Sequence, residues 1–452
     1  MIDSQTAQDR CAQLLDAAKA AGADAADTIA RAESSEGVSV RLGKLEDVER
    51  SEGEEIGLRV FVGRRSASVH TSDFSAAAFA ELAERAVAMA KLAPEDPYAG
   101  LAPADALLSE DPDLASLDLK GDDEPGPESL RERALEAEDA ARAVAGVTNS
   151  EGAMASYGQA VVALATSNGF ASSYEGASHS LHASVIGGSG ASMQRDSASR
   201  SARHLEDLPP CAEVGALAGA RTVAKLNPGA MPSRIMPVVF DPRVSSSLVA
   251  HLLSAMVGPA IARKASFLLG KLEDDLFAAE IRIVENPHMR RGLRSRPFDG
   301  EGVATMPRTL VESSKVTGWL TNVASAAQLG LPLTGHASRS VGGAPGVGVS
   351  NVELLPGEQS RDELIADIAD GVLVTELIGQ GVNELTGDYS RGAVGFRIEN
   401  GEITSPVTEF TVAGNLLDMF RSLRAANDAE IWRAICVPSI RIEGMTVAGD
   451  GG

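Results

Sequence analysis

Apolar residues recur every three or four positions in several segments of the chain, which is the spacing of one face of a helix. In the first of these segments, Cys11, Leu14 and Ala18 share such a face, and Gly22 ends the run. Pro94 stops the second segment in the same way. The spacing predicts helices over residues 4–21, 75–92, 128–144 and 211–224.

Between these helices, apolar and polar residues alternate, which is the period of a strand with one buried face. Val38 and Val40 alternate with Ser39 and Arg41, and residues 57–63 repeat the pattern between two glycines. Runs of this kind, bounded by glycine, predict a curled antiparallel sheet in the N-terminal half. Further strands are expected over residues 147–157, 160–167, 171–186 and 190–202.

Prolines interrupt the pattern between the second and third helices. Segment 94–127 carries them among Asp and Glu residues, so we expect a long acidic connector packed loosely on the surface. The breaker Asn227-Pro228-Gly229 then divides the chain. We expect an N-terminal α+β domain over residues 1–227, with helices on the sheet, and a mainly β domain with a few helices over residues 228–452. The predicted fold class is α+β.

The C-terminal half begins with the apolar run 234–240, expected as a buried strand and followed by a helical run over 243–269. A late helix is expected over 415–426. Between them, the dipeptide Asn400-Gly401 separates two alternating runs. Because both residues readily adopt positive φ, this dipeptide predicts a tight hairpin between a strand through Phe396 and Ile398 and a return strand through Val407, Phe410 and Val412.

The formal charge of −23 and the pI near 4.8 bear on the partners of the chain. Binding to nucleic acid or to anionic membranes rests on Lys and Arg, so neither is expected here. One local cluster, Arg290, Arg291, Arg294 and Arg296, fits either a carboxylate-rich partner or a solvated face. The N-terminus lacks a basic region followed by an apolar one, and no run approaches the ~20 apolar residues of a membrane span, so we expect a cytoplasmic protein.

Most motifs of catalysis are absent from the sequence. The cysteines Cys11, Cys211 and Cys436 are far apart and have no metal-knuckle spacing. His179 and His182 lie three apart in an expected strand, which sends them to opposite faces. The glycine-rich loop 342–348 lacks the Gly-Lys-Ser/Thr ending of a phosphate-binding loop.

Two turns retain chemistry of interest. Residues 295–302 place Asp299 and Glu301 on a glycine-flanked turn, and residues 386–391 place hydroxyls, a carboxylate and a guanidinium on another. Paired carboxylates can act as acid and base, whereas turn carboxylates commonly bond the local backbone. The sequence leaves both interpretations open.

The stretch from Gly381 to Phe396, continuing through Glu399-Asn400-Gly401-Glu402-Ile403 to Ala413-Gly414-Asn415-Leu416-Leu417, resembles the C-terminal signature of the TldD/PmbA family. Ser295–Gly302 also matches the Ser-x-x-Phe-Asp-x-Glu-Gly pattern of that family. The resemblance is weak over residues 1–225 and strong over 235–452. It implies a two-domain α+β fold and a place among intracellular zinc metallopeptidases built from two related subunits, only one of which carries a His-Glu-x-x-x-His zinc helix.

The corresponding helix, residues 248–260, has one histidine, His251, and no glutamate. The second family ligand would fall on Met256, and a shift by one residue puts the two ligand positions on Ala250 and Ala255. Residues 421–428, which match the family's Cys-Gly-Lys stretch, contain no cysteine. The resemblance is therefore to the PmbA (TldE) branch, the subunit without the zinc motif.

This resemblance implies no metal ligand, no cofactor and no catalytic residue in this chain, with zinc held by a TldD-like paralogue in a heterodimer that degrades or processes unfolded peptides. Whether the chain forms a homodimer without that partner is left open. The candidate substrate-binding residues are Ser295, Asp299, Glu301, Gly302, Thr386, Asp388, Ser390 and Arg391. Two alternatives stand beside this interpretation: a regulatory module that binds a DNA gyrase-associated protein, and an independent hydrolase that uses Asp299 and Glu301.

Overall fold

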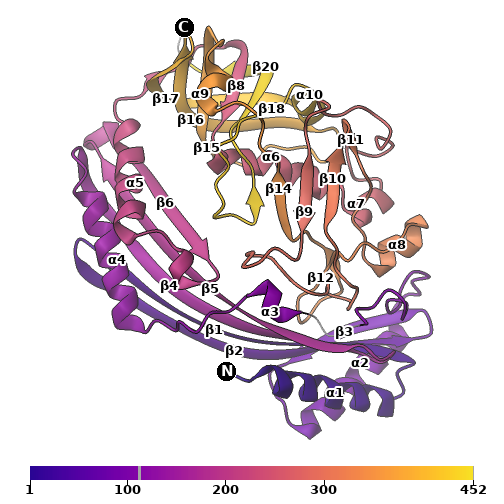
Figure 1. Cartoon of the computed structure of the whole chain (residues 1–452). Coiled ribbons are helices and arrows are strands. Elements are labelled where there is room, and N and C mark those ends of the chain that lie inside the picture. The colour runs from indigo at the N-terminus through magenta and orange to yellow at the C-terminus, as the bar shows by residue number, and fades with distance from the viewer. Residues whose placement is uncertain (110–112, 451–452) are drawn as a thin grey trace.

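The computed structural model describes residues 1–109 and 113–450 and has an α+β fold, as the sequence predicts (Figure 1). The N-terminal half is a curved six-stranded sheet in the order β3-β2-β1-β4-β5-β6, in which all neighbours are antiparallel. Its strands are β1 (Ala25–Arg41), β2 (Lys44–Val62), β3 (Arg65–Thr71), β4 (Val147–Thr166), β5 (Ala171–Gly187) and β6 (Gln194–Ala202).

Two pairs of helices cover one face of this sheet. The helices α1 (Ser4–Ala20) and α2 (Ala76–Leu92) pack at one end, against Ala30 of β1. The helices α4 (Pro127–Arg142) and α5 (Cys211–Ala224) pack at the other end, against Val38 and Val40 of the same strand. Because side chains alternate along a strand, these even-numbered residues share a face. The odd-numbered face is free to meet the C-terminal half, on the inner side of the curved sheet in Figure 1.

The C-terminal half is organised around a closed ring of strands. The strand order β18-β20-β8-β15-β16-β17-β7 has an additional pairing between β17 and β20, which joins β20, β8, β15, β16 and β17 into the ring. The members are β7 (Gly229–Ala230), β8 (Arg234–Phe240), β15 (Asp370–Ile378), β16 (Asp388–Glu399), β17 (Glu402–Asn415), β18 (Arg424–Ala425) and β20 (Ile440–Ala448).

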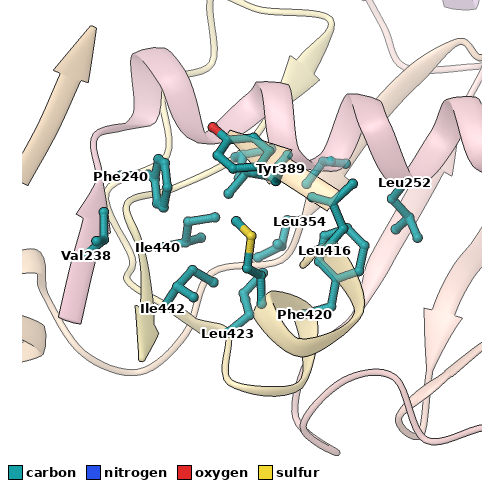
Figure 2. Close-up of a cluster of buried hydrophobic side chains, with 14 of the residues drawn as sticks. Val238, Phe240, Leu252, Leu354, Tyr389, Leu416, Phe420, Leu423, Ile440 and Ile442 are labelled. Atoms are coloured by element: carbon teal, nitrogen blue, oxygen red, sulfur yellow. The ribbon is translucent and has the colours of Figure 1, made fainter. Parts of the chain in front are cut away.

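A second sheet of order β11-β10-β9-β14-β19 and several short helices pack beside this ring. Figure 2 shows the shared core, which includes Leu416 and Phe420 of α10 (Leu416–Arg421), Tyr389 of β16 and Phe240 of β8. The remaining strands are β9 (Ile283–Asn286), β10 (Arg308–Glu312), β11 (Lys315–Val316), β12 (Ala337–Ser338), β13 (Gly346–Val347), β14 (Asn351–Leu354) and β19 (Ile435–Cys436). The remaining helices are α3 (Leu114–Leu117), α6 (Pro242–Ala255), α7 (Gly258–Ala262), α8 (Val323–Leu329), α9 (Arg361–Ile365) and α10 (Leu416–Arg421). In the two described segments, no helix is long and apolar enough to cross a membrane.

The expected hairpin is confirmed: β16 pairs with β17, and Asn400 and Gly401 have φ of 53° and 82°. The helix expected over 243–269 is shorter in the structure, because Val257 is extended and a separate helix, α7, begins at Gly258 with Pro259 in its first turn. The late helix is also shorter than expected, because residues after Ser422 turn into β18. Conversely, the strands expected over 147–157 and 160–167 form one strand, since Gly158 pairs on both sides. Strand β6 starts at Gln194, after a 3₁₀ turn over Gly190–Ser192.

The proline-rich connector is packed more tightly than its composition predicts. Leu117 and Leu119 are 4% and 5% exposed, and the Leu117 carbonyl accepts a hydrogen bond from the Arg291 backbone N–H at 2.8 Å. Asp118 pairs with both Arg290 and Arg291, so part of the expected arginine cluster is used in internal ion pairs. Apolar residues between the prolines supply this burial. Residues 110–112 of the connector lie outside the described part of the chain.

A close approach of α4 and α5 generates a stability prediction. A Cβ on Gly215 of α5 would lie 1.9 Å from the Ala137 carbonyl oxygen of α4, so Gly215→Ala forces the helices apart. We expect the free energy of unfolding to fall by about 1–3 kcal/mol despite the better helix propensity of alanine. Urea titration followed by circular dichroism measures it. The control Gly53→Ala, with no atom within 4 Å, should leave stability unchanged or slightly raised, and equal effects of both variants would contradict the prediction.

Candidate functional site

The turn at 295–302 lies buried where the N-terminal sheet meets the C-terminal half. Asp299 Oδ1 accepts hydrogen bonds from the backbone N–H groups of Glu301 at 2.8 Å and Val303 at 3.0 Å, and Oδ2 accepts one from Ala337 at 2.9 Å. Burial nevertheless raises the pKa of this carboxyl. These three hydrogen bonds correspond to the second interpretation of Asp299, a turn carboxylate that binds backbone N–H groups. The residue also lines a small cavity of about 170 Å³.

Glu301 belongs to an ionic network that spans both halves. Its Oε1 lies 3.3 Å from the Arg59 guanidinium of β2, and its Oε2 accepts a hydrogen bond from the Val323 N–H at 2.8 Å. Arg59 and Arg339 both pair with Asp27 of β1. Burial raises the pKa of Glu301 to about 7. Burial also opposes ionisation of Asp27, but the two guanidinium groups outweigh it and hold that pKa below its usual range.

The other two predicted residues of this turn have packing contacts. Ser295 is buried, donates to the Met289 carbonyl oxygen at 2.6 Å and accepts from the Asn351 amide at 2.8 Å. Gly302 has a φ of 82°, and a Cβ there would lie 2.8 Å from the Phe170 ring. Both residues are enclosed by protein in this arrangement. Their role in binding substrate stays a prediction.

The second predicted segment, residues 386–391, divides between two faces. Thr386, Asp388 and Ser390 are exposed. The Thr386 hydroxyl donates to Asp388 Oδ2 at 2.6 Å and the Asn415 amide donates to Oδ1 at 3.1 Å, and these two bonds lower the pKa of Asp388. Arg391 lies on the opposite face of β16 with Tyr389, because side chains two apart share a face.

Tyr389 and Arg391 face His251 of α6. The rings of His251 and Tyr389 meet edge to face, with centroids 6.3 Å apart. Burial lowers the pKa of His251, and the positive charge of Arg391 lowers it further. Three buried atoms in this group, His251 Nε2, Tyr389 OH and Arg391 Nε, have no hydrogen-bond partner among the described residues.

This group does not fit a zinc ion. Zinc sites in proteins use several imidazole, thiolate or carboxylate donors, whereas His251 is a single imidazole beside a guanidinium that repels a divalent cation. Met256, one turn along α6, is fully buried in the core. Within residues 1–109 and 113–450, no group of three or more His, Cys, Asp or Glu side chains is placed to hold a metal ion.

A third feature has no signature in the sequence. A cavity of about 490 Å³ lies around the edge strand β6, between the sheet with α5 and the C-terminal half, and we call it the basic cleft. The cations that line it come from β6, from α5 and the residue after it, from α6 and from the segment before β19. Because these residues are scattered over nearly 240 positions, they form no contiguous motif that could be recognised in the sequence. They are Arg195, Arg200, Arg221, Lys225, Arg243 and Arg433.

Models of a known protein family and individual relatives match this chain over most of its length. The PmbA/TldA metallopeptidase domain 1 matches residues 26–90, the central domain 120–226 and the C-terminal domain 233–449. Metalloprotease PmbA of Escherichia coli O157:H7 is 37% identical over 414 residues, covering 91% of this chain and 89% of that protein. A PmbA homologue of Haemophilus influenzae is 35% identical over 421 residues, covering 91% and 90%.

Solved structures share the fold. A crystal structure from Bacteroides thetaiotaomicron, of a protein named for modulation of DNA gyrase, has a TM-score of 0.90 and 26% identity, covering 99% of this chain and 100% of that one. TldE from Thermococcus kodakarensis has a TM-score of 0.85 at 21% identity, covering 97% and 100%. The second likeness concerns the fold alone.

The raised pKa of Glu301 predicts a pH-dependent stability. Its folded-state pKa, about 7, exceeds the ordinary 4.5, so the folded protein binds this proton more tightly than the unfolded chain does. The resulting stability is complete below pH 4.5 and is lost as the pH rises through 7. Glu301→Gln should match the original protein near pH 5 and exceed its free energy of unfolding by about 1–3 kcal/mol near pH 8.5.

Urea titrations at several pH values measure this difference. Glu402→Gln, at an exposed position of β17, is the matched control and should leave the pH profile unchanged. Parallel profiles for the original protein and the Glu301→Gln variant would show that Glu301 is ionised in the folded state throughout this range.

Proposed function

The chain belongs to the PmbA/TldD metallopeptidase family, and from this premise we propose that it is the metal-free subunit of a two-chain cytoplasmic zinc peptidase that acts on unfolded peptides. In this proposal a TldD-like paralogue with an intact His-Glu-x-x-x-His helix holds the zinc. The present chain binds and positions the peptide and forms one wall of the chamber in which it is cut.

The observation that carries this proposal is the composition of the α6 and β16 group. A zinc helix needs a second imidazole one turn from the first and a carboxylate that takes a proton from metal-bound water. Here His251 is accompanied by the Arg391 guanidinium, and Met256 is part of the apolar core. The donors therefore favour a role in binding over a role in activating water.

Binding of unfolded chains has a physical basis in the sheet edge. An extended peptide has unpaired N–H and C=O groups along its whole length, and the edge of a sheet bonds them regardless of side-chain sequence. In the described part of the chain, β6 pairs with β5 on one side and with no strand on the other. A folded protein has few such free segments, so this mode of binding selects unfolded substrates.

A second candidate is a regulatory protein-binding module. It is favoured by the name of the Bacteroides thetaiotaomicron relative, which refers to modulation of DNA gyrase. The charge of −23 supports protein binding over direct DNA contact in this case.

We expect the isolated chain to bind no stoichiometric zinc and to cleave no peptide, because water activation needs a metal that its donors do not hold. Mixing it with a zinc-bearing paralogue should produce cleavage of unfolded peptides. Metal analysis of dialysed protein and a fluorogenic peptide assay measure the two outcomes. Chelator-resistant cleavage by this chain alone would overturn the proposal and favour an acid–base role for Asp299 and Glu301. A paralogue that is fully active alone would favour the regulatory module.

Replacing residues of segment 386–391 should separate substrate binding from folding. We expect Asp388→Asn and Arg391→Gln to lower turnover by the mixed subunits several-fold without removing zinc from the mixture. Size-exclusion chromatography measures assembly separately, and Glu402→Gln is the control on the neighbouring strand. If the variants fail to assemble with the paralogue, and turnover falls only to the same extent, these residues stabilise the turn and do not bind substrate.

A further inference from the structure

The basic cleft has a polar floor. His182 pairs across the sheet with Ser199, and Ser184 pairs with Ser197, so these four side chains lie on the same face of β5 and β6. This is the inner face, opposite to the one covered by α4 and α5. Hydroxyl groups at this density can bond a polar ligand or its water. Asp196 and Arg200 project from the other face of β6, on the side of α5, so the cleft extends around this edge strand. The wall across from the strand comes from α6 and β15 of the C-terminal half.

The charge of the cleft runs against that of the protein. The chain has 63 Asp and Glu residues against 40 Lys and Arg. Inside the cleft the order is reversed, because the six cations named above share the lining with Glu151, Asp196 and Glu376 and have Asp241 and Glu430 beside them. Low-dielectric walls strengthen the field of such a cluster, so the cleft concentrates anions locally on a protein that repels them at long range.

Internal carboxylates neutralise these cations unevenly. Lys225 and Arg243 are well paired with Asp196, at 2.9 Å and 3.0 Å. Arg200, Arg221 and Arg433, in contrast, share the single carboxylate of Glu430, at 3.7, 3.4 and 3.9 Å. Three guanidinium groups therefore have one partner at marginal distances. Burial lowers the pKa of Arg221, and the nearby charge of Arg243 lowers it further, which is the condition that an added anion would relieve.

The cleft continues into a pocket of mixed character. This neighbouring cavity of about 440 Å³ shares Asp196, Arg221, Arg243 and Thr375 with the cleft. Its apolar wall is formed by Leu217, Leu373, Phe396 and Ile403, and charged side chains, among them Asp241, Arg361, Asp428 and Glu430, line the rest. Both volumes fall within the range of ligand-binding pockets, about 300–1,000 Å³. A group of cations next to an apolar wall fits a peptide that carries an acidic and an apolar side chain better than it fits a free inorganic ion.

The geometry points to a subsite for an acidic peptide: the basic cleft binds a carboxylate of an extended peptide that lies along β6, and the neighbouring pocket takes an apolar side chain of the same peptide. Arginine suits this role because its planar fork bonds both oxygens of a carboxylate. The carboxylate has two sources, an Asp or Glu side chain or the C-terminus of the peptide. This inference rests on the proposed role in peptide binding and adds the substrate class.

Fluorescence anisotropy with the full-length chain alone tests the subsite. The probe is a labelled, unstructured peptide in which Glu residues alternate with Leu, and it is compared with its Gln counterpart, each with a free or an amidated C-terminus. We expect the Glu peptide to bind at least about tenfold more tightly than the Gln peptide, with the difference shrinking as salt is raised. Preference for the acid over the amide, with Glu and Gln equal, would assign the cleft to the C-terminus instead.

Variants at the rim connect the effect to the cleft. Arg195 and Arg433 are 71% and 37% exposed, so Arg195→Gln and Arg433→Gln should fold normally, which thermal melting checks. Together they should remove most of the preference for the acidic peptide. The control Arg282→Gln replaces a half-exposed arginine of the same type outside the cleft and should leave the preference unchanged.

Three results would overturn the inference. All four peptides could bind equally well, the Arg282→Gln control could lose the preference for the acidic peptide to the same extent, or a single-stranded oligonucleotide of matched charge could compete as well as the acidic peptide does. Because binding is measured without a paralogue, the two proposals fail separately. Cleavage by the mixed subunits with no dependence on peptide charge contradicts the acidic subsite alone. Charge-dependent binding without cleavage in any mixture contradicts the peptidase role and leaves the subsite.

Discussion

The arrangement of the two halves depends on a buried ionic network around Asp27. This carboxylate lies on the inner face of β1 and pairs with Arg59 from the adjacent strand and with Arg339 from the C-terminal half. Glu301 adds a second carboxylate to Arg59. Replacing the ionised Asp27 would leave two buried guanidinium groups uncompensated, and losing one member of a buried pair typically costs about 3–5 kcal/mol. Because Asp27, Arg59 and Arg339 are buried, their charges are matched only when the two halves are correctly aligned.

This register places the other features. The junction sits at one end of the curved sheet, next to α1 and α2, and the basic cleft lies at the other end, where β5 and β6 face α6 and β15. Ion pairs also join the two halves at the cleft, between Asp196 and Arg243 and between Lys225 and Glu376, so the halves are connected at both ends of the sheet. The inner face of the sheet, free of the helices that cover its outer face, is thus available for a ligand along part of its length.

Local chemistry made much of the fold predictable from the sequence. The hairpin at Asn400-Gly401 follows from the preference of these residues for positive φ, and the helix starts follow from caps such as Asp3 and Ser75. Errors arose where a local pattern continued past a break. The apolar run beyond Ala255 looked helical, although Val257 is extended and the residues on either side of it form backbone hydrogen bonds with Leu320. The connector was misjudged because leucines 107, 117 and 119 were outweighed by prolines in its composition.

The candidate site was predictable only in part, for a related reason. That a turn carboxylate such as Asp299 bonds nearby N–H groups follows from its neighbours in sequence. The partners of Glu301 come from positions far along the chain, and the basic cleft is assembled from residues between 195 and 433. Such groups come together only when long strands pair in the correct register. The sequence alone does not show which residues of two strands lie opposite each other.

The place of β6 at the border of its sheet has a consequence for self-association. An uncovered strand invites pairing with the same strand of a second copy, which is how many sheet proteins begin to aggregate. Two copies brought together at this border would set Arg195 and Arg200 of each against like charges. The cations that make the cleft attractive to an acidic chain would therefore also oppose pairing of β6 with the same strand of a second copy.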